Sequence, residues 1–388
     1  EIYMKKILMV VVSVLVVGCL IFIWKDELFG KRVDNNSSNL NDVKKNNVST
    51  DLFGQYYDDA EKIMKDMTLE EKIGQLFLVR YDKNLASSWV YDYHPGGFIM
   101  FAKDFDNHTK DSIKEEIDNL QSISKIPLVV AVDEEGGYVT RVSRYPNFRD
   151  SKFLSPREYY ETGGEELLEK TEKEKATLLL SIGVNLNLAP VADVSINSND
   201  FINIRTFNRD AKETAVFIGK MVKYANDVGI SSSLKHFPGY GNNVDTHTGV
   251  AIDERSYENF LENDYLPFEE GIKNKVPTVL VSHNIINCID SKYPATLSKK
   301  VIGELREKLN FSGIVITDDL SMGAVSSYVE DGSAAVLAVN SGDDLIITSD
   351  FVKMYDEVYQ AVTDKKIDIE TIDRAVKRNI AWKIAYDM

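Results

Sequence analysis

The feature that most limits the fold of this chain is a series of eight short apolar segments separated by amphipathic stretches. Runs such as PLVVAV and GIVIT are continuously apolar, which is typical of parallel strands that helices bury on both faces. The predicted strands are residues 75–80, 97–101, 127–132, 184–189, 231–236, 277–283, 313–317 and 344–348. Eight parallel strands alternating with helices predict an α/β fold, a closed (β/α)8 TIM barrel.

The segments between these strands have the composition of helices. Residues 158–180 are rich in Glu, Lys, Leu and Ala, and residues 298–309 begin with a serine that can cap a helix. A doubly wound open sheet is the competing architecture, but no GxGxxG motif follows the first strand and no phosphate loop is present. We therefore expect a single catalytic domain over residues 51–388.

The first fifty residues differ from the rest of the chain. Lys5 and Lys6 precede an apolar run over residues 7–24, which reaches the length needed to span a bilayer core of about 30 Å. The basic flank would stay cytoplasmic, so the remainder would be exported. Cys19, in VVGC, also resembles a lipoprotein processing site, so an uncleaved helix and a lipidated cysteine both remain open.

The predicted organisation is therefore a signal or membrane anchor over residues 1–30, a flexible Asn- and Ser-rich linker over residues 31–50, and the exported domain. This topology predicts a protein held at the extracytoplasmic face of the cell membrane, associated with the cell wall. We expect it to act there as a monomer.

Composition excludes several classes of function. The formal net charge is −16, which opposes attraction to nucleic acid because the summed field repels phosphate. The chain has two cysteines, Cys19 and Cys288, in very different contexts, which are too few for a disulfide scaffold. No CxxC or paired Cys/His spacing predicts structural zinc.

Polar residues cluster where the predicted strands end, which is where a barrel enzyme places its catalytic groups. They are Asp133, Asp193, Lys235, His236, His283, Asp318 and Asp319. The histidines invite a metal-dependent interpretation, but no HxH motif or ligand cluster supports one, so we expect no metal and no cofactor. Carboxylates and a proton donor suit the cleavage of a glycosidic bond better.

Six motifs resemble glycoside hydrolase family 3, in the order that family shows. LKHFPGYGNNVDTH (234–247) resembles the signature of its β-N-acetylglucosaminidase branch, which uses a histidine as acid/base. The others are VDEEGGYVTRV (132–142), GVNLNLAPVADV (183–194), INIRTFNRD (202–210), PATLS (294–298) and ITDDLSMGA (316–324). The resemblance covers the chain from about residue 55 onward and implies a (β/α)8 barrel.

The resemblance also implies roles for individual residues. Asp318 would be the nucleophile, and side-chain alternation along a strand would let only one of Asp318 and Asp319 face the barrel mouth. His247 would be the acid/base, with Asp245 orienting its imidazole. The implied sugar-binding residues are Asp133, Arg141, Arg205, Lys235 and His236.

Some positions depart from the family pattern or stay open. Tyr240 stands where the family usually has the histidine of GHG, and Glu134 stands where it usually has glutamine. Arg144 is an alternative to Arg141 if the alignment of that loop shifts. We interpret Asp193 and His283 as supporting residues.

The predicted activity is that of a retaining exo-β-N-acetylglucosaminidase, which removes terminal N-acetylglucosamine (GlcNAc) through a covalent glycosyl-aspartate. The resemblance implies that GlcNAc is linked to N-acetylmuramic acid in cell-wall fragments. Another family 3 exo-glycosidase, such as a β-glucosidase, is the nearest alternative. A catalytically inert, surface-tethered sugar-binding lipoprotein and a metal-dependent barrel hydrolase are the others.

Overall fold

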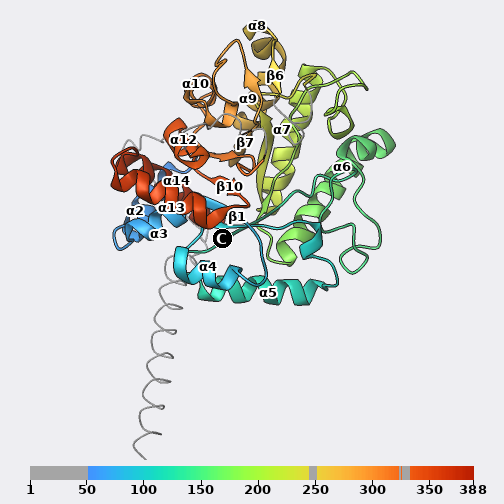
Figure 1. The fold of residues 1–388 in the computed structure, drawn as a ribbon. Helices are drawn as coiled ribbons and strands as arrows, with labels where there is room; N and C mark the ends of the chain where they lie inside the picture. The colour runs from blue at the N-terminus through green and yellow to red at the C-terminus, as the bar shows by residue number, and fades with distance from the viewer. Residues whose placement is uncertain (1–50, 244–250, 323–324, 326–332) are drawn as a thin grey trace, which may run out of the picture.

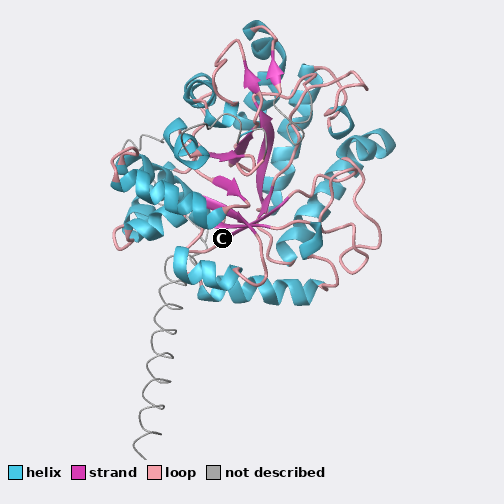
Figure 2. Cartoon of the chain, in the orientation of Figure 1, coloured by secondary structure: helices cyan, strands magenta, loops and turns pink. Residues whose placement is uncertain are grey.

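The structure is a computed structural model that describes residues 51–243, 251–322, 325 and 333–388. The described residues form a barrel of eight parallel strands surrounded by helices (Figures 1 and 2). The strands are β1 (Phe77–Arg80), β2 (Gly97–Ile99), β3 (Val129–Val132), β4 (Leu186–Asn187), β5 (Ser231–Phe237), β7 (Thr278–Val281), β9 (Ile314–Thr317) and β10 (Ile346–Thr348). The (β/α)8 fold predicted from the apolar segments is confirmed.

The strands pair in the order β10-β1-β2-β3-β4-β5-β7-β9, so each barrel strand lies beside the next one in the chain. The last strand returns to the first, with Phe77 opposite Ile346. β9 and β10 meet through a shorter contact, in which the amide of Thr317 donates to the carbonyl oxygen of Leu345 at 3.0 Å. These two contacts close the ring.

Seven of the barrel strands are shorter than the predicted segments and lie within them, whereas β5 extends one residue beyond its segment. Every residue of β3, β7 and β9 is buried, as continuous apolar runs predict. Gly97 shows how closely β2 and β3 approach, because a Cβ atom there would lie 2.0 Å from the carbonyl oxygen of Val129. The flanking residues leave the strand ladder and form the loops that carry polar side chains.

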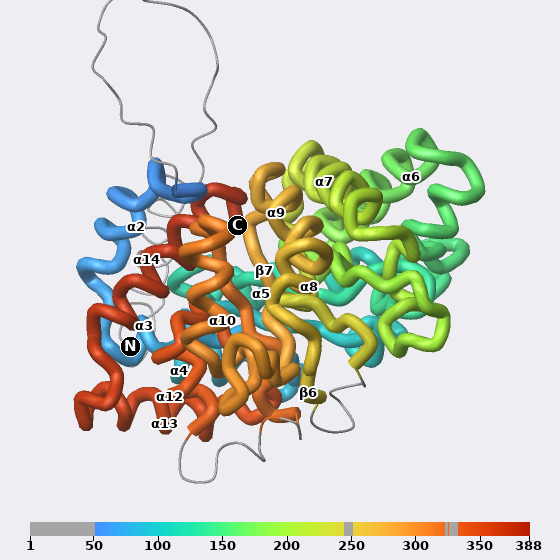
Figure 3. The backbone as a smooth tube through the Cα atoms, turned by 90° about the horizontal axis from the view of Figure 1, so that it is seen from above, coloured from blue at the N-terminus to red at the C-terminus, as the bar shows by residue number. Residues whose placement is uncertain are grey.

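Helices cover the outside of the barrel, as the view from above shows (Figure 3). They are α2 (Tyr57–Met64), α3 (Leu69–Gly74), α4 (Ala86–Tyr93), α5 (Lys110–Ile123), α6 (Pro156–Ser181), α7 (Ala211–Val228), α8 (Tyr257–Asn259), α9 (Tyr265–Lys273), α10 (Lys299–Gly303), α12 (Ala334–Ser341), α13 (Phe351–Thr363) and α14 (Ile369–Ala385). Several of these helices begin after a residue with a hydroxyl side chain. The hydroxyl oxygen accepts a hydrogen bond from a backbone N–H that has no partner within the helix. Thr68, Thr109 and Ser155 each do so in a capping box.

Two predicted helices are less regular than expected. The helix predicted over residues 158–180 is α6, which is interrupted at Gly163 and Gly164, where the backbone leaves the helical region. The helix predicted over residues 298–309 begins at the Ser298 cap, but α10 passes into a wider turn over Glu304–Lys308. A small parallel pair, β6 (Ile252–Asp253) and β8 (Ile285–Ile286), was not predicted, because strands of two residues carry no periodicity.

Helix α14 packs across the end of the barrel where the strands begin. Its Asn379 side chain donates to the carbonyl oxygens of Gln75 and Asp344, at 3.2 and 2.8 Å. Trp382 Nε1 donates to Ser231 Oγ at 2.9 Å. One helix therefore ties the starts of β1, β5 and β10 together.

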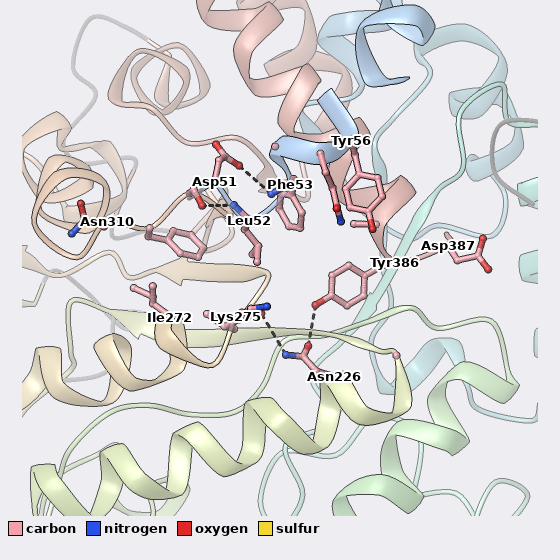
Figure 4. Close-up of a pocket in the computed structure, with 17 residues that line it drawn as sticks. Asp51, Leu52, Phe53, Tyr56, Asn226, Ile272, Lys275, Asn310, Tyr386 and Asp387 are labelled. Carbon is pink, nitrogen blue, oxygen red and sulfur yellow. Dashed lines mark hydrogen bonds between the residues drawn. The ribbon is translucent and has the colours of Figure 1, made fainter. Parts of the chain in front are cut away.

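A cavity of 1240 Å³ opens at this same end of the barrel (Figure 4). Its walls come from residues 51–56, from the segments that precede β5, β7 and β9, and from residues 385–387. Tyr386 Oη donates to Asn226 Oδ1 at 3.0 Å on one wall. The cavity lies opposite the strand ends at which a barrel enzyme carries out its chemistry.

The predicted membrane segment over residues 7–24, Cys19 and the linker over residues 31–50 lie outside the described residues. Within the part of the chain that is described, no helix has the length and apolar character needed to cross a membrane.

Candidate active site

A cavity of 290 Å³ lies where the strands end, and most of the polar residues singled out from the sequence border it. Its apolar walls include side chains that project from or follow the strands, among them Ile99, Leu188, Leu280 and Ile347. The charged and polar lining residues are Asp133, Glu135, Arg141, Arg205, Lys235, His236, Asp318 and Asp319. An apolar pocket with a few convergent polar groups is the usual form of a small-ligand site.

Asp318 follows directly after β9 and borders the cavity. Its amide donates to the carbonyl oxygen of Val281 at 3.2 Å, and this hydrogen bond attaches the residues after β9 to the end of β7. Asp318 Oδ1 accepts the amide of Asp319 at 2.8 Å. The backbone therefore holds this carboxylate at the mouth of the barrel.

Asp319 also borders the cavity, so the predicted side-chain alternation does not keep one of the two aspartates away from it. Their contacts distinguish them. Asp319 Oδ2 accepts Ser349 Oγ at 2.7 Å, and Oδ1 accepts the amide of Ser321 at 2.9 Å. The Asp319 carboxylate is thus used to join the loops that follow β9 and β10.

Lys235, on β5, joins two carboxylates from the loop after β3. Its Nζ lies 2.6 Å from Asp133 Oδ1 and 2.7 Å from Glu135 Oε1. Glu135 also accepts two hydrogen bonds from Arg205, from Nε to Oε2 at 3.0 Å and from Nη2 to Oε1 at 2.7 Å. Arg141 lies 3.7 Å from Asp133. Four of the five predicted sugar-binding residues are therefore brought together in one ionic network, which leaves His236 beside it.

Glu135 is the centre of this network and was not among the residues predicted from the sequence. Burial alone would raise the pKa of its carboxyl, but the charges of Arg205 and Lys235 hold that pKa well below its usual range. The same pairing raises the pKa of the Arg205 guanidinium against the effect of burial. The available signal was the second acidic residue of the EEGG motif, directly after a strand end.

His236 is held by Asp193, which was interpreted as a supporting residue. Asp193 Oδ2 lies 2.8 Å from His236 Nδ1 and accepts the backbone amide of His236 at 3.1 Å. If Nδ1 carries the proton, Nε2 accepts from Arg205 Nη2, which lies 3.3 Å away. Asp193 Oδ1 also accepts the amide of Tyr240 at 2.7 Å, and the Tyr240 and His236 rings meet edge to face at 5.2 Å.

Of the two arginines that the sequence left as alternatives, Arg141 borders the cavity and Arg144 does not, while the sugar-binding role of Arg141 stays a prediction. Arg144 is exposed and lies over the Tyr145 ring, 5.8 Å from its centroid. The loop that carries Arg141 is fixed by Glu134, whose Oε2 accepts the amides of Arg141 and Val142 at 2.6 and 2.7 Å. The carboxylate that replaces the usual glutamine thus acts as an anchor for backbone donors.

His283 lies beneath the turn that carries the two aspartates. It is fully buried, and its Nε2 donates to the carbonyl oxygen of Asp319 at 3.0 Å. This contact agrees with its interpretation as a supporting residue.

Asp245 and His247 lie outside the described residues, so their predicted acid/base role stays a prediction. Among the side chains that the structure does describe, no group of three or more His, Cys, Asp or Glu residues is arranged to hold a metal ion.

Comparison with known proteins identifies the family. The model of the Glycosyl hydrolase family 3 N terminal domain matches residues 68–381. A beta-hexosaminidase from Haemophilus influenzae is 32% identical over 271 residues, which are 66% of this chain and 73% of that relative. Beta-hexosaminidase A from Pseudoalteromonas piscicida is 30% identical over 279 residues, which are 67% of this chain but 47% of that relative.

Solved structures agree with this assignment. A glycoside hydrolase family 3 β-N-acetylglucosaminidase from Paenibacillus sp. str. FPU-7 superposes with a TM-score of 0.76 and 29% identity, covering 82% of this chain and 63% of that one. A glycosyl hydrolase of the same family from Mycobacterium smegmatis gives a TM-score of 0.73 at 27% identity, and 98% of that chain is covered. The family match extends over most of the described barrel, and this chain belongs to glycosyl hydrolase family 3.

Proposed function

We propose that this protein is a retaining exo-β-N-acetylglucosaminidase. The observation that carries the proposal is the position of Asp318 at the end of β9, in the wall of a cavity that also contains the network of Asp133, Lys235 and Arg205. The names of the beta-hexosaminidase relatives support the choice of an N-acetylated sugar. The cavity volume of 290 Å³ lies just below the range of about 300–1,000 Å³ for ligand sites and suits one sugar ring.

Binding is assigned to the ionic network. Asp133 would accept bonds from sugar hydroxyl groups, while Arg141, Arg205 and Lys235 would donate to hydroxyl or carbonyl oxygens. The network is largely formed before a ligand enters, because Lys235 and Glu135 are buried and already paired. Because these donors are already ordered, less side-chain entropy is lost when a ligand binds.

Catalysis would proceed in two displacements. The Asp318 carboxylate attacks the anomeric carbon, the bond to the leaving oxygen breaks, and that oxygen takes a proton from His247. His247 then removes a proton from water, which attacks the same carbon and releases Asp318. Two inversions give net retention at the anomeric centre. Asp245 would hold the imidazole in the required orientation and stabilise its protonated form.

The proposed substrate is GlcNAc linked to N-acetylmuramic acid in peptidoglycan fragments, and the proposed location is the outer face of the cell membrane. The basic residues that precede the apolar run over residues 7–24 support this location. Proteolysis of intact protoplasts tests it, since an exported domain is digested without lysis and a cytoplasmic one is protected. We propose a monomer, which light scattering of the purified protein tests.

The activity is tested with 4-nitrophenyl N-acetyl-β-D-glucosaminide and the matching β-glucoside, each with and without a chelator. We expect a strong preference for the N-acetyl substrate that the chelator does not change, and a first product of β configuration by NMR. Preference for the glucoside would instead assign the protein to another type of family 3 exo-glycosidase. Inactivity on both would favour a sugar-binding protein, and activity lost on chelation would favour a metal-dependent hydrolase.

A further inference from the structure

A buried ionic cluster lies behind the loop that follows β5. Arg255, two residues after β6, donates from Nη2 to Asp253 Oδ2 at 2.7 Å and from Nη1 to Asp264 Oδ2 at 2.8 Å. Both carboxylates are only 1% exposed. One guanidinium therefore joins the carboxylate of β6 to the carboxylate that precedes α9. None of these residues borders the cavity described above.

The cluster contacts the chain on both sides of residues 244–250. On the side before them, Arg255 Nη2 donates to the carbonyl oxygen of Gly239 at 3.2 Å. Asn243 Nδ2 donates to Asp253 Oδ2 at 2.6 Å, which joins the last described residue before this segment to β6 after it. On the far side, the amide of Ile285 donates to the carbonyl oxygen of Ala251 at 2.8 Å, so the chain returns onto β8.

Two glycines make these contacts close. Gly239 has φ +128°, and a Cβ atom there would lie 2.2 Å from Asp264 Oδ1. Gly241 has φ +55°, and a Cβ atom there would lie 2.4 Å from Arg255 Cζ. Both values favour glycine, and both positions place the backbone directly against the charged groups. The cluster thus fixes the course of residues 239–241 by contact as well as by hydrogen bonds.

The same stretch is attached to the cavity from its other side. Tyr240, between the two glycines, donates its amide to Asp193, and Asp193 also holds His236 in the cavity wall. Asp193 and Arg255 therefore fix one short stretch of backbone relative to the sugar-binding network. Asp245 and His247 follow that stretch by a few residues in the sequence.

We propose that Arg255 is a positioning residue for the proton donor, which it serves by fixing the two described ends of the chain around residues 244–250. This inference rests on the proposed function, because it takes His247 as the acid/base. Lysine could not replace arginine here, since a single ammonium lacks the planar fork that bonds two carboxylates and a carbonyl oxygen together.

The test compares Arg255→Lys with Arg306→Lys in the full-length protein. Arg306 is a matched control, because it also pairs with a buried aspartate, Asp344, and donates to backbone carbonyl oxygens, but at the opposite end of the barrel. For each variant, kcat/KM is measured with aryl N-acetyl-β-glucosaminides whose leaving groups span a wide range of pKa. His247→Ala provides the reference for a lost proton donor.

We expect Arg255→Lys to resemble His247→Ala. The kcat/KM for activated aryl substrates should fall only a few-fold. The kcat/KM for substrates with poor leaving groups should fall about 10²-fold, because these substrates depend most on proton donation. Arg306→Lys should keep the wild-type dependence on leaving group. Asn243→Ala removes only one tie to Asp253 and should show the same pattern as Arg255→Lys in weaker form, which keeps the test valid if Arg255→Lys does not fold.

The outcomes separate the two proposals. If the wild-type protein hydrolyses no N-acetylglucosaminide, the proposed function is wrong and the inference falls with it. The other case has an active wild type and a steeper leaving-group dependence in His247→Ala. If Arg255→Lys and Asn243→Ala then lower kcat/KM equally for all substrates, the role of Arg255 is structural only and the inference alone is overturned.

Discussion

Lys235 and Asp133 meet across the cavity, with the lysine Nζ 2.6 Å from Oδ1 of the aspartate, although 101 residues separate them in the sequence. The lysine side chain is only 3% exposed and is shared with Glu135. One buried ammonium thus balances two carboxylates that would otherwise repel each other.

Replacing Lys235 by Met should lower kcat/KM for the aryl N-acetyl substrate by about 10²-fold. Hydrogen bonds to charged groups contribute about 1.5–3 kcal/mol each, and the variant also leaves Asp133 and Glu135 uncompensated. Steady-state kinetics measures the loss, and thermal unfolding measures the accompanying loss of stability. Kinetics equal to those of the wild type would show that Lys235 does not contribute to binding.

Glu135→Gln should destabilise the fold by about 3 kcal/mol at neutral pH, because it leaves Arg205 and Lys235 without their shared buried partner. The pKa of Glu135 is held below its usual range, so its stabilising effect is present above the unfolded value of about 4.3 and is lost as pH falls. The wild type should therefore lose stability more steeply than Glu135→Gln between about pH 5 and pH 3. Urea unfolding at several pH values measures both slopes, and parallel slopes would contradict the assignment.

Asp318→Asn should reduce turnover by about 10³-fold or more, because the amide cannot form the glycosyl ester. Asp319→Asn is the matched control, since it changes the neighbouring carboxylate that bonds Ser321 and Ser349. The control should lose stability by about 1–3 kcal/mol and retain more activity than Asp318→Asn. Intact-protein mass spectrometry with a slow fluorinated substrate should detect the sugar ester only when Asp318 is present.

Lys383 makes stability depend on pH in the alkaline range. It is buried, it donates to Gln75 Oε1 and the carbonyl oxygen of Gly96 at 2.7 and 2.9 Å, and burial lowers its pKa to about 7. Between pH 7 and the unfolded value of 10.5, only the unfolded chain binds the proton, so stability rises with pH. The stability of the wild type relative to Lys383→Met should increase by up to about 1.4 kcal/mol per pH unit in this range. A difference that stays constant from pH 7 to pH 10 would show that Lys383 remains protonated in the fold.

Much of the barrel could be predicted because long-range burial leaves a local trace. The strands must be apolar on both faces, so segments such as 127–132 and 313–317 stand out against amphipathic neighbours. The polar residues after them, including Asp133 and Asp318, mark the strand ends for the same reason. The kink of α6 at Gly163 and Gly164 was missed, since two glycines in a helical pattern do not reveal whether the helix bends or ends.

The supporting groups were harder to predict than the groups they support. Glu135 acts by joining Arg205, 70 residues away, to Lys235. Arg255 joins Asp264 and Gly239, which lie 9 and 16 residues from it on opposite sides in the sequence. Such pairs depend on where the chain returns in space, and a single sequence carries no signal for that. The choice between Asp318 and Asp319 also depends on contacts with Ser349, 30 residues away.

The pairing of β10 with β1 also sets the order in which the barrel can close during synthesis. During synthesis, β1 is made long before β10 and α14, so one edge of the growing sheet stays open until residues 346–348 have been made. An open edge can pair with another chain, and slow, non-local closure prolongs that risk. The barrel therefore cannot close until β10 has been made, and β1 presents an unpaired edge to other chains until then.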